Sequence, residues 1–217
     1  MTKSALVPEA QEKSLWERFI TAEKLSEQTA HQFKCYASLL QEWNERTNLT
    51  RITCLADIIT YHFQDSMHVR DFVDLASCKG ICDVGAGAGF PALPISILYP
   101  DVPVVLVEVN HKKIVFLRTV IEELGLQNCI VSDYDWRTFL RKAPYVLDLF
   151  VARASLQPEE LVRIFSPSSI YKNAQLIYWA SQHWEPEGKE AAYLVKKEAY
   201  ILDDHTRYFA FFASPRV

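Results

Sequence analysis

Three alternating glycines directly after a short apolar run are the residues of this chain best suited to ligand binding. Residues 81–84 form that run and contain Asp83, and Gly85, Gly87 and Gly89 follow with alanines between them. Glycine allows positive φ and close approach of a ligand, and the free N–H groups of a following helix point back at such a loop. The pattern predicts a buried strand that turns sharply into a helix at a nucleotide-type site.

The glycine spacing separates three kinds of site. A dinucleotide fingerprint is G-x-G-x-x-G, whereas this loop reads G-x-G-x-G and has Phe90 where the third fingerprint glycine would stand. A Gly-Lys-Ser/Thr ending is absent, so the loop is not a phosphate-cradling P-loop. The spacing favours a loop that holds S-adenosylmethionine, in which no pyrophosphate has to be accommodated. A structural tight turn and a nicotinamide dinucleotide site are the alternatives.

An acid stands at the end of the next predicted strand. Residues 102–107 are rich in β-branched side chains, and Glu108 follows them about 20 residues after the glycine loop. A carboxylate at the carboxyl end of a parallel strand is placed to accept hydrogen bonds from both ribose hydroxyls of an adenosine. A solvated strand-end carboxylate is the alternative interpretation. Glu108 is therefore the second candidate for cofactor binding.

A sheet with helices on both faces would position these residues. The predicted strands are 81–84, 102–108, 128–132, 147–152 and 175–179, and the predicted helices between them are 91–98, 111–124 and 157–165. This alternation is typical of an α/β fold with a parallel, doubly wound sheet, in which ligands bind beyond the carboxyl ends of the strands. Two aromatic-rich segments, 193–202 and 208–213, are predicted to add an antiparallel hairpin.

The first third of the chain is predicted to be helical. The elements expected there are helices over 14–29, 30–45 and 55–61 and a loop over 44–50. Their apolar stripes need a surface to cover, so we expect an N-terminal helical cap on the sheet. The length suits one domain, which we place at 14–217 after a flexible N-terminus at 1–13. Within it, the cap spans 14–78 and the α/β core spans 79–217.

Composition limits the remaining classes of protein. The net charge of −4 lacks the basic excess that usually marks a nucleic-acid-binding domain. No apolar run approaches the ~18 residues that a membrane span needs, and the N-terminus lacks the pattern of a signal peptide. Five scattered cysteines indicate reduced thiols, and no second Cys/His pair accompanies Cys78 and Cys82 to form a metal site. We expect a cytoplasmic protein without metal.

Positive charges at predicted strand and helix ends are further candidates. Arg153 directly follows a strand predicted to be buried, and an unpaired buried guanidinium is costly, so a ligand-facing role is favoured. Lys112 and Lys113 begin a predicted helix, where a solvated face and a phosphate contact are both open. A basic face would favour an RNA substrate, and a closed apolar pocket above Gly85 would favour a small one. The residues of that basic face are Arg46, Arg51, Lys112, Lys113 and Arg118.

Several separated motifs over roughly residues 30–155 resemble those of a known family. They are Trp43-Asn44 with Asn48-Leu49-Thr50, His62-x-x-Asp65-Ser66, the loop from Asp83 to Pro94, Glu108 with Lys112-Lys113 and Phe116-Leu117, and Ala152-Arg153-Ala154. Together they resemble the bacterial small-subunit (16S) rRNA guanine-N7 methyltransferases of the RsmG, formerly GidB, type. The resemblance implies a Rossmann-like class I methyltransferase fold and methyl transfer from S-adenosylmethionine to guanine N7.

The resemblance also implies roles for individual residues. The expected cofactor-binding residues are Asp83, Gly85, Gly87, Gly89, Phe90, Glu108, Trp136, Arg137 and Arg153. Arg153 is the expected catalytic residue, which either orients the guanine through O6 or holds the methionyl carboxylate. The expected substrate contacts are Asn48, His62, Asp65, Ser66, Lys112 and Lys113. The implied partner is small-subunit rRNA or an assembling small subunit, and we expect a monomer.

Two segments depart from the family pattern. After the third strand the family shows Arg-Ala/Val-Glu, whereas this chain has Asp135-Trp136-Arg137. After the fifth strand the family has Lys-Gly, whereas residues 178–181 read Tyr-Trp-Ala-Ser. Two alternatives therefore stay open. One is a methyltransferase that acts on a small molecule or a protein, and the other is a cofactor-binding homologue without transfer activity that serves as a sensor or assembly factor.

Overall fold

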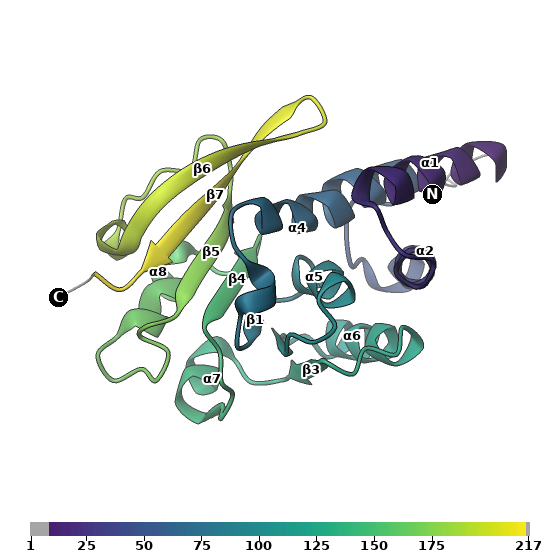
Figure 1. Cartoon of the computed structure of the whole chain (residues 1–217). Coiled ribbons are helices and arrows are strands. Elements are labelled where there is room, and N and C mark those ends of the chain that lie inside the picture. Colours follow the sequence, from purple (N-terminus) through teal and green to yellow (C-terminus); the bar gives the residue numbers. More distant parts are fainter. Residues whose placement is uncertain (1–8, 216–217) are drawn as a thin grey trace.

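The computed structural model describes residues 9–215, which form a seven-stranded sheet with helices on both faces (Figure 1). The strand order is β3-β2-β1-β4-β5-β7-β6, and the strands are β1 Ile81–Val84, β2 Val104–Val107, β3 Cys129–Ser132, β4 Leu149–Arg153, β5 Gln175–Ala180, β6 Leu194–Leu202 and β7 His205–Ala213. Strands β1 to β5 are parallel, and β7 pairs antiparallel with β5 and β6. The order reverses between β1 and β4, where a doubly wound sheet opens its ligand crevice.

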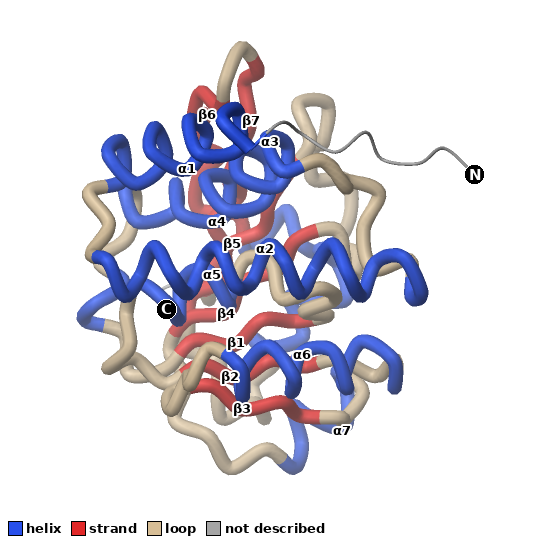
Figure 2. The backbone as a smooth tube through the Cα atoms, turned by 90° about the vertical axis from the view of Figure 1, so that its right-hand side faces the viewer, coloured by secondary structure: helices blue, strands red, loops and turns tan. Residues whose placement is uncertain are grey.

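The helices form two layers. They are α1 Glu9–Glu23, α2 Glu27–Thr47, α3 Leu55–Ile58, α4 Asp65–Met67, α5 Ala92–Leu98, α6 His111–Glu123, α7 Trp136–Lys142 and α8 Pro158–Leu161. A π-helical turn, η1 Ile59–Gln64, joins α3 to α4, and the 3-10 turns are η2 His68–Asp71, η3 Leu75–Ser77, η4 Val162–Phe165 and η5 Lys189–Tyr193. Figure 2 shows α1, α2 and α6 crossing in front of the strands.

Each face of the sheet has its own hydrophobic core. Successive strand residues point to opposite faces, so Ile81 packs into one core and Cys82 into the other. The first core includes Phe116 of α6 together with side chains of α1, α2 and α5, and the second includes Phe139 of α7 and Phe150 of β4. The parallel sheet, the antiparallel hairpin and the helical cap confirm the predicted fold class.

The first two helices differ in their bounds from the prediction. Helix α1 begins at Glu9 and ends at Glu23, so residues 9–13 belong to the helix and not to a flexible terminus. Residues 1–8 of that expected terminus lie outside the described residues. Lys24 has a φ of +53°, and Ser26 caps α2 by accepting a hydrogen bond from the Thr29 N–H. A helix over 14–29 is therefore wrong, because the chain reverses at 24–26.

The loop predicted over 44–50 starts later than expected. Helix α2 continues to Thr47, and Asn48 ends it in the left-handed region with a φ of +49°. The helix predicted over 55–61 is α-helical only to Ile58 and then widens into η1. Helix α7 was not predicted, although Asp135 caps it by accepting bonds from the Arg137 and Thr138 N–H groups. No helix within residues 9–215 has the length and apolar character to cross a membrane.

Candidate active site

The turn after β1 is formed by three glycines in the left-handed region. The φ angles are +75° at Gly85, +60° at Gly87 and +95° at Gly89. An added Cβ would lie 2.5 Å from Ser155 Cβ at Gly85 and 2.3 Å from Leu93 Cδ1 at Gly89. At Gly87 it would meet only the Gly85 carbonyl oxygen, at 3.8 Å. Packing therefore requires two of the glycines, whereas the space beside Gly87 is open to a ligand.

Asp83 is a fully buried carboxyl group on β1 that is only half satisfied. Its Oδ2 accepts a hydrogen bond from the Ala92 N–H at 3.2 Å, whereas Oδ1 has no hydrogen-bond partner among residues 9–215. Burial raises the pKa of Asp83 to about 7, although the Ala92 N–H and the Arg153 charge lower it, and nearby Glu108 adds to the rise. A cationic ligand beside Oδ1 would satisfy this oxygen and favour the ionised carboxylate. Asp83 thus fits a positively charged cofactor.

Glu108 follows β2 and joins two turns. Its Oε2 accepts a hydrogen bond from the Gly87 N–H at 2.9 Å, and its Oε1 accepts from Val109 at 2.9 Å and Asn110 at 2.8 Å. Each carboxylate oxygen can accept two hydrogen bonds, so Oε2 retains one acceptor site for a ligand hydroxyl. The structure therefore brings two predicted cofactor residues, Gly87 and Glu108, into direct contact.

Phe90 lies between two aromatic rings just before α5. Its ring stacks on His62, with centroids 4.2 Å apart and planes 11° apart, and on Tyr36, with centroids 5.2 Å apart. The Arg153 Cζ lies 5.1 Å from the Phe90 ring centre. The hydroxyl of Tyr36 donates a hydrogen bond to the Ala88 carbonyl, which ties α2 to the glycine turn. Phe90 is therefore a buried connection between the glycine turn, the cap and Arg153.

The guanidinium of Arg153 is held by the helical segment that covers the end of β4. Its Nη1 donates to the Tyr61 carbonyl oxygen at 3.0 Å and to Asp65 Oδ2 at 2.8 Å, and its Nη2 lies 2.8 Å from His62 Nδ1. These contacts use three of the five N–H donors of an arginine. The Nε–H and one Nη2–H have no hydrogen-bond partner among the described residues. Arg153 is thus fixed in place and still has donors for a ligand.

His62 accepts from Arg153 as a neutral ring. Arginine can only donate, so His62 Nδ1 is the acceptor and its Nε2–H donates to Thr50 Oγ1 at 2.9 Å. Burial and the charge of Arg153 lower the pKa of His62 to about 3. Thr50 is fixed in turn by Asn44, which accepts from the Thr50 N–H at 2.8 Å and donates to its carbonyl at 2.9 Å. A chain of hydrogen bonds from Asn44 therefore orients Arg153.

Asp65 supports Arg153 from the hairpin side. While Oδ2 accepts from Arg153, Oδ1 accepts from the Tyr200 hydroxyl at 2.7 Å, and the Asp65 carbonyl accepts from Trp179 Nε1 at 3.2 Å. Tyr200 belongs to β6 and Trp179 to β5. Asp65 therefore connects the cap, the sheet and the hairpin at the position of Arg153.

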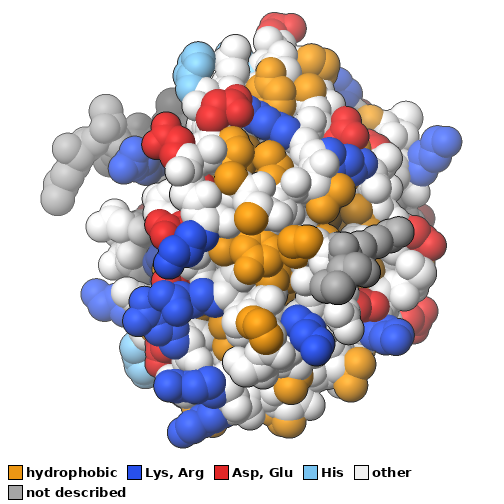
Figure 3. Space-filling model, turned by 90° about the vertical axis from the view of Figure 1, so that its left-hand side faces the viewer, with side chains coloured by type: hydrophobic (Ala, Val, Ile, Leu, Met, Phe, Trp, Pro, Cys, Tyr) orange, Lys and Arg blue, Asp and Glu red, His pale blue; other side chains and the backbone are white. Residues whose placement is uncertain are grey.

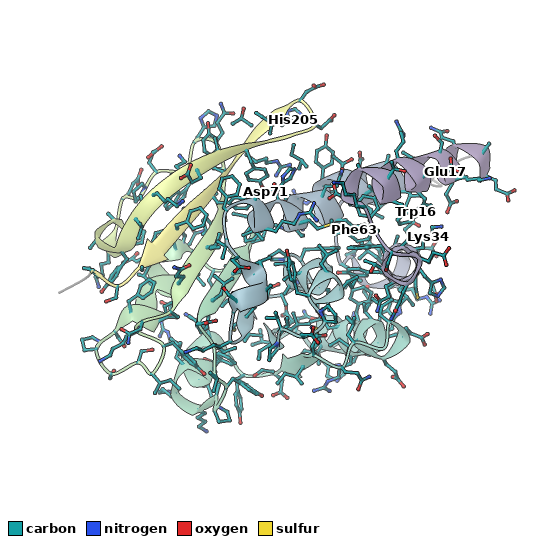
Figure 4. All side chains as sticks on the ribbon, viewed as in Figure 1. Trp16, Glu17, Lys34, Phe63, Asp71 and His205 are labelled. Carbon is teal, nitrogen blue, oxygen red and sulfur yellow. The ribbon has the colours of Figure 1, made fainter. Side chains whose placement is uncertain are left out.

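A cleft of about 620 Å³ opens beside Arg153, and none of the three turn glycines lines it. Its wall consists of η1, the ends of β4 and β5, and the hairpin formed by β6 and β7. His205, which lines the cleft, lies near the tip of that hairpin (Figure 4). The site thus has a glycine-turn side and a cleft side, and Arg153 contacts both.

Comparison with known sequences identifies the family. A model of rRNA small subunit methyltransferase G (GidB) matches residues 29–204. The chain is 37% identical over 173 residues to the ribosomal RNA small subunit methyltransferase G of Acholeplasma laidlawii, covering 80% of this chain and 74% of that protein. It is 35% identical over 183 residues to the protein of the same name from Staphylococcus epidermidis, covering 80% and 76%. The chain belongs to the rRNA small subunit methyltransferase G family.

A solved structure agrees with this family at the level of the fold. A SAM-dependent methyltransferase from Aquifex aeolicus superposes with a TM-score of 0.54 at 15% identity, covering 77% of this chain and 98% of that one. The resemblance to the rRNA small subunit methyltransferase G family drawn from the motifs is confirmed. The family motifs that contain Asn44, Thr50, His62 and Asp65 provide the hydrogen bonds that hold Arg153 in place.

Three of the expected substrate contacts, Ser66, Asp65 and His62, are buried side chains that bind other protein groups. Ser66 is fully buried and donates to the His62 carbonyl oxygen at 2.6 Å. Asp65 is 1% exposed and His62 is 6% exposed, and both bind Arg153. Ser66 is therefore too deeply buried to contact RNA. His62 and Asp65 hold Arg153 and also line the cleft beside it, so a substrate contact by these two side chains stays a prediction.

Trp136 and Arg137 do not join the expected cofactor residues. The Trp136 ring is buried in the second core, where it stacks on Phe139, and its Nε1 donates to the Glu160 carbonyl at 3.0 Å. The guanidinium of Arg137 binds the Glu160 carboxylate on the surface, with Nε 2.8 Å from Oε1. Both side chains are bound to protein groups, and the Trp136 ring points into the core, so their role as cofactor ligands stays a prediction.

The expected basic contacts remain accessible. Lys112 is exposed and Lys113 is half-buried at the start of α6, beside Glu108, and Asn48 is exposed at the end of α2. Figure 3 views the molecule from the side of β6, away from α6, and shows other Lys and Arg side chains gathered along the left part of that face. A net charge of −4 therefore coexists with a local concentration of positive charge.

The sequence did not indicate several supporting residues. Tyr36, Trp179 and Tyr200 reach the site from α2, β5 and β6, and their spacing in the chain gives no sign of it. Thr50 and Asn44 were visible only as parts of family motifs. Within residues 9–215, no group of three or more His, Cys, Asp or Glu side chains could hold a metal, and the five cysteines are free.

Proposed function

We propose that this chain transfers a methyl group from S-adenosylmethionine to N7 of a guanine in small-subunit rRNA. Membership of the rRNA small subunit methyltransferase G family supports the reaction class and the rRNA. The structural observation that carries the proposal is the unpaired Oδ1 of buried Asp83, which lies on the strand that leads into the open turn at Gly87. A buried acceptor without a partner beside a glycine turn is suited to a cationic, nucleoside-type cofactor.

Three residues of the crevice would hold the cofactor. Asp83 would accept from its ammonium group, the open face of Gly87 would allow its close approach, and Glu108 would accept from the ribose hydroxyls. Gly85 and Gly89 allow the close packing of the turn, and Phe90 connects the turn to Arg153 through its contacts with His62 and the guanidinium. The adenine would contact the backbone that follows β3, since the Trp136 ring is packed in the core and its Nε1 donates to the Glu160 carbonyl.

Methyl transfer to guanine N7 requires no acid or base from the protein side chains. S-Adenosylmethionine supplies a methyl group bonded to a positively charged sulfur. Guanine N7 presents a free lone pair at neutral pH and forms the new C–N bond as the C–S bond breaks, so no general base is needed. The rate would come from in-line positioning and from electrostatics in a site that excludes water. This agrees with the lack of an obvious acid–base pair among the expected site residues.

Arg153 is the residue that we assign to catalysis. It lines the cleft as well as contacting Phe90, and its unused N–H donors can bind a guanine O6. Arg153 lines the cleft, whereas the glycine turn that would hold the cofactor does not. An orienting role toward the guanine is therefore favoured over binding of the methionyl carboxylate. Asn44, Thr50, His62 and Asp65 act through Arg153 as positioning residues.

The surface around the crevice completes the proposal. Lys112 and Lys113 at the start of α6 would contact RNA phosphates, and Asn48 at the end of α2 would contact the same substrate. We further propose that the chain works as a cytoplasmic monomer. We also propose that the cap, whose predicted start at residue 14 is extended to Glu9 by α1, runs to residue 78 and covers an α/β core that begins at residue 79.

Methyl transfer to the natural substrate tests the proposal. Small ribosomal subunits from a strain lacking this protein would be incubated with the protein and methyl-labelled S-adenosylmethionine, and the labelled nucleotide would be mapped. We expect label at N7 of a single guanine, and loss of the label with Arg153→Ala at unchanged cofactor binding. Cofactor binding without any incorporation would indicate a different substrate or a protein without transfer activity.

A further inference from the structure

The cleft beside Arg153 has an aromatic wall. Its aromatic side chains come from η1, β5, the loop after β5 and β6, and they are Tyr61, Tyr178, Trp179, Trp184 and Tyr200. Bases of single-stranded RNA stack on such rings with little dependence on sequence, because every base has a π-face. The volume of about 620 Å³ lies in the range of sites that enclose small organic ligands. The cleft therefore has the size and surface of a base-binding site.

Tyr178 and Trp184 form the part of this wall with free polar atoms. Their ring centres are 5.8 Å apart and their planes are inclined by 57°. The Lys197 Nζ donates to the Trp184 carbonyl at 2.6 Å and fixes the loop that carries Trp184. Neither the Tyr178 hydroxyl nor the Trp184 indole N–H has a hydrogen-bond partner among residues 9–215. These two side chains can offer both a stacking face and a polar contact.

The rim of the cleft carries an arginine, Arg207, and a histidine, His205. The Arg207 Cζ lies 5.7 Å from the Tyr61 ring centre, and this guanidinium forms no ion pair with a described residue. His205 is exposed near the hairpin tip (Figure 4). Asp65 is the one carboxylate among the lining residues, and both of its oxygens are already bound. At the hairpin turn, Asp203 accepts from the Tyr61 hydroxyl at 3.2 Å. An unpaired arginine beside aromatic rings is suited to a nucleotide phosphate.

We propose that this cleft receives one nucleotide of the RNA substrate, turned out of its base stack, with the base against Tyr178 and Trp184 and its phosphate on Arg207. This rests on the proposed function. Enzymes that modify bases act on single strands or turn the base out of the stack, and in an A-form RNA helix N7 lies in a deep, narrow major groove that side chains cannot enter. Arg153 lines the same cleft, so a base held there lies beside the catalytic group. Methylation at N7 leaves positive charge on the base, which the aromatic faces also attract.

Binding of a mononucleotide tests the cleft without the RNA. Guanosine 5′-monophosphate and guanosine would be titrated by calorimetry into the full chain saturated with S-adenosylhomocysteine. We expect saturable binding of the nucleotide and about tenfold weaker binding to Trp184→Ala, with most of the affinity kept in Trp184→Phe. Arg207→Ala should weaken the nucleotide about tenfold and leave guanosine unchanged, because it removes only the phosphate contact.

Matched variants control for position and folding. Arg141 is an exposed arginine on α7, outside the cleft, so Arg141→Ala should bind guanosine 5′-monophosphate as the unaltered protein does. Trp184 is half-buried and packs edge-on against Phe212, with ring centres 6.0 Å apart, so Trp184→Phe is the variant that keeps an aromatic ring in this packing, and thermal unfolding would confirm that every variant is folded at the temperature of the titration. The proposal is overturned if the protein saturated with S-adenosylhomocysteine shows no saturable binding of the nucleotide, or if Trp184→Ala and Arg207→Ala both bind the nucleotide as tightly as the unaltered protein does.

A second readout separates this proposal from the proposed function. With small ribosomal subunits as substrate, Trp184→Ala should raise the KM about tenfold while the affinity for S-adenosylmethionine stays unchanged. If the parent protein transfers no methyl group to these subunits, the proposed function fails, and the nucleotide titration still decides whether the cleft binds a nucleotide. If transfer occurs and Trp184→Ala leaves its KM unchanged, the cleft assignment fails alone.

Discussion

Two buried carboxyl groups on the two sides of Arg153 differ in how far they are satisfied. Asp65 accepts hydrogen bonds on both oxygens, from Arg153 and Tyr200, whereas Oδ1 of Asp83 has no partner among residues 9–215. A buried acid whose partners are all protein groups fixes a structure, and a buried acid without a partner costs stability unless a ligand supplies one. Asp65 therefore belongs to the residues that support Arg153, and Asp83 belongs to the residues that would bind the cofactor.

Removal of Asp65 should have the largest effect on stability. In Asp65→Ala the guanidinium of Arg153 and the hydroxyl of Tyr200 lose their partner in the interior, and loss of one member of a buried ion pair costs about 3–5 kcal/mol. Urea unfolding would measure this. The matched exposed pair is Glu42 with Arg46, so Glu42→Ala should cost under about 1 kcal/mol. Equal losses in the two variants would refute the supporting role of Asp65.

The two glycines of the turn should separate stability from binding. Gly89→Ala forces a Cβ against Leu93 and Tyr36 and should cost about 1–3 kcal/mol of unfolding free energy. Gly87→Ala meets open space and should cost about 1–2 kcal/mol for its left-handed conformation, while lowering the affinity for S-adenosylmethionine at least about tenfold. Calorimetry and urea unfolding of both variants would check this. Full cofactor affinity in Gly87→Ala would contradict a cofactor beside that glycine.

Asp83 should make cofactor binding depend on pH. A cationic cofactor needs the ionised carboxylate, so the affinity for S-adenosylmethionine should rise between pH 6 and 8, around the pKa of about 7. Asp83→Asn should bind more weakly and without this dependence, as titration calorimetry at several pH values would show. A pH-dependent rise that persists in Asp83→Asn would have to come from another group.

Asp83 and His62 should have opposite effects on the pH dependence of stability. Between about pH 4 and 7 the folded protein keeps a proton on Asp83 that the unfolded chain releases, so this group lowers stability as pH rises. Between about pH 3 and 6.5 the unfolded chain protonates His62 and the folded protein does not, so this group lowers stability as pH falls. On acidification from pH 6.5 to 4.5, Asp83→Asn should therefore lose more stability than His62→Gln. Parallel unfolding curves for the two variants would contradict both shifts.

The smallest expected effect concerns the surface of α6. Lys112→Glu should weaken RNA binding a few-fold at low salt and leave cofactor affinity unchanged, because an exposed phosphate contact contributes mainly through charge. Lys142→Glu on α7 has the same change of charge at another exposed position and serves as the control. Filter binding to small-subunit rRNA would compare them, and equal affinities would remove Lys112 from the interface.

The sequence was sufficient for the groups that lie next to the glycine turn. Strand alternation predicted the sheet, and it placed the glycine turn and Glu108 together at the carboxyl ends of adjacent strands, although the hydrogen bond between Gly87 and Glu108 was not predicted. It was not sufficient for the surroundings of Arg153, because Tyr61 and Asp65, which bind Arg153, lie about 90 residues before it in the chain, and Tyr200, which binds Asp65, lies on β6. The capping groups Ser26 and Asp135 were readable signals that set α2 and α7.

A crystal structure with bound S-adenosylhomocysteine would show on which side of Arg153 the cofactor lies. We expect its ammonium group against Asp83 Oδ1, its ribose hydroxyls against Glu108 and the molecule in contact with the open face of Gly87. Asp65 and Arg153 should still be paired, and the cleft at Trp184 should be free. A cofactor bound in that cleft against Tyr178 and Trp184, with Asp83 still unpartnered, would contradict the division between a supporting side and a binding side.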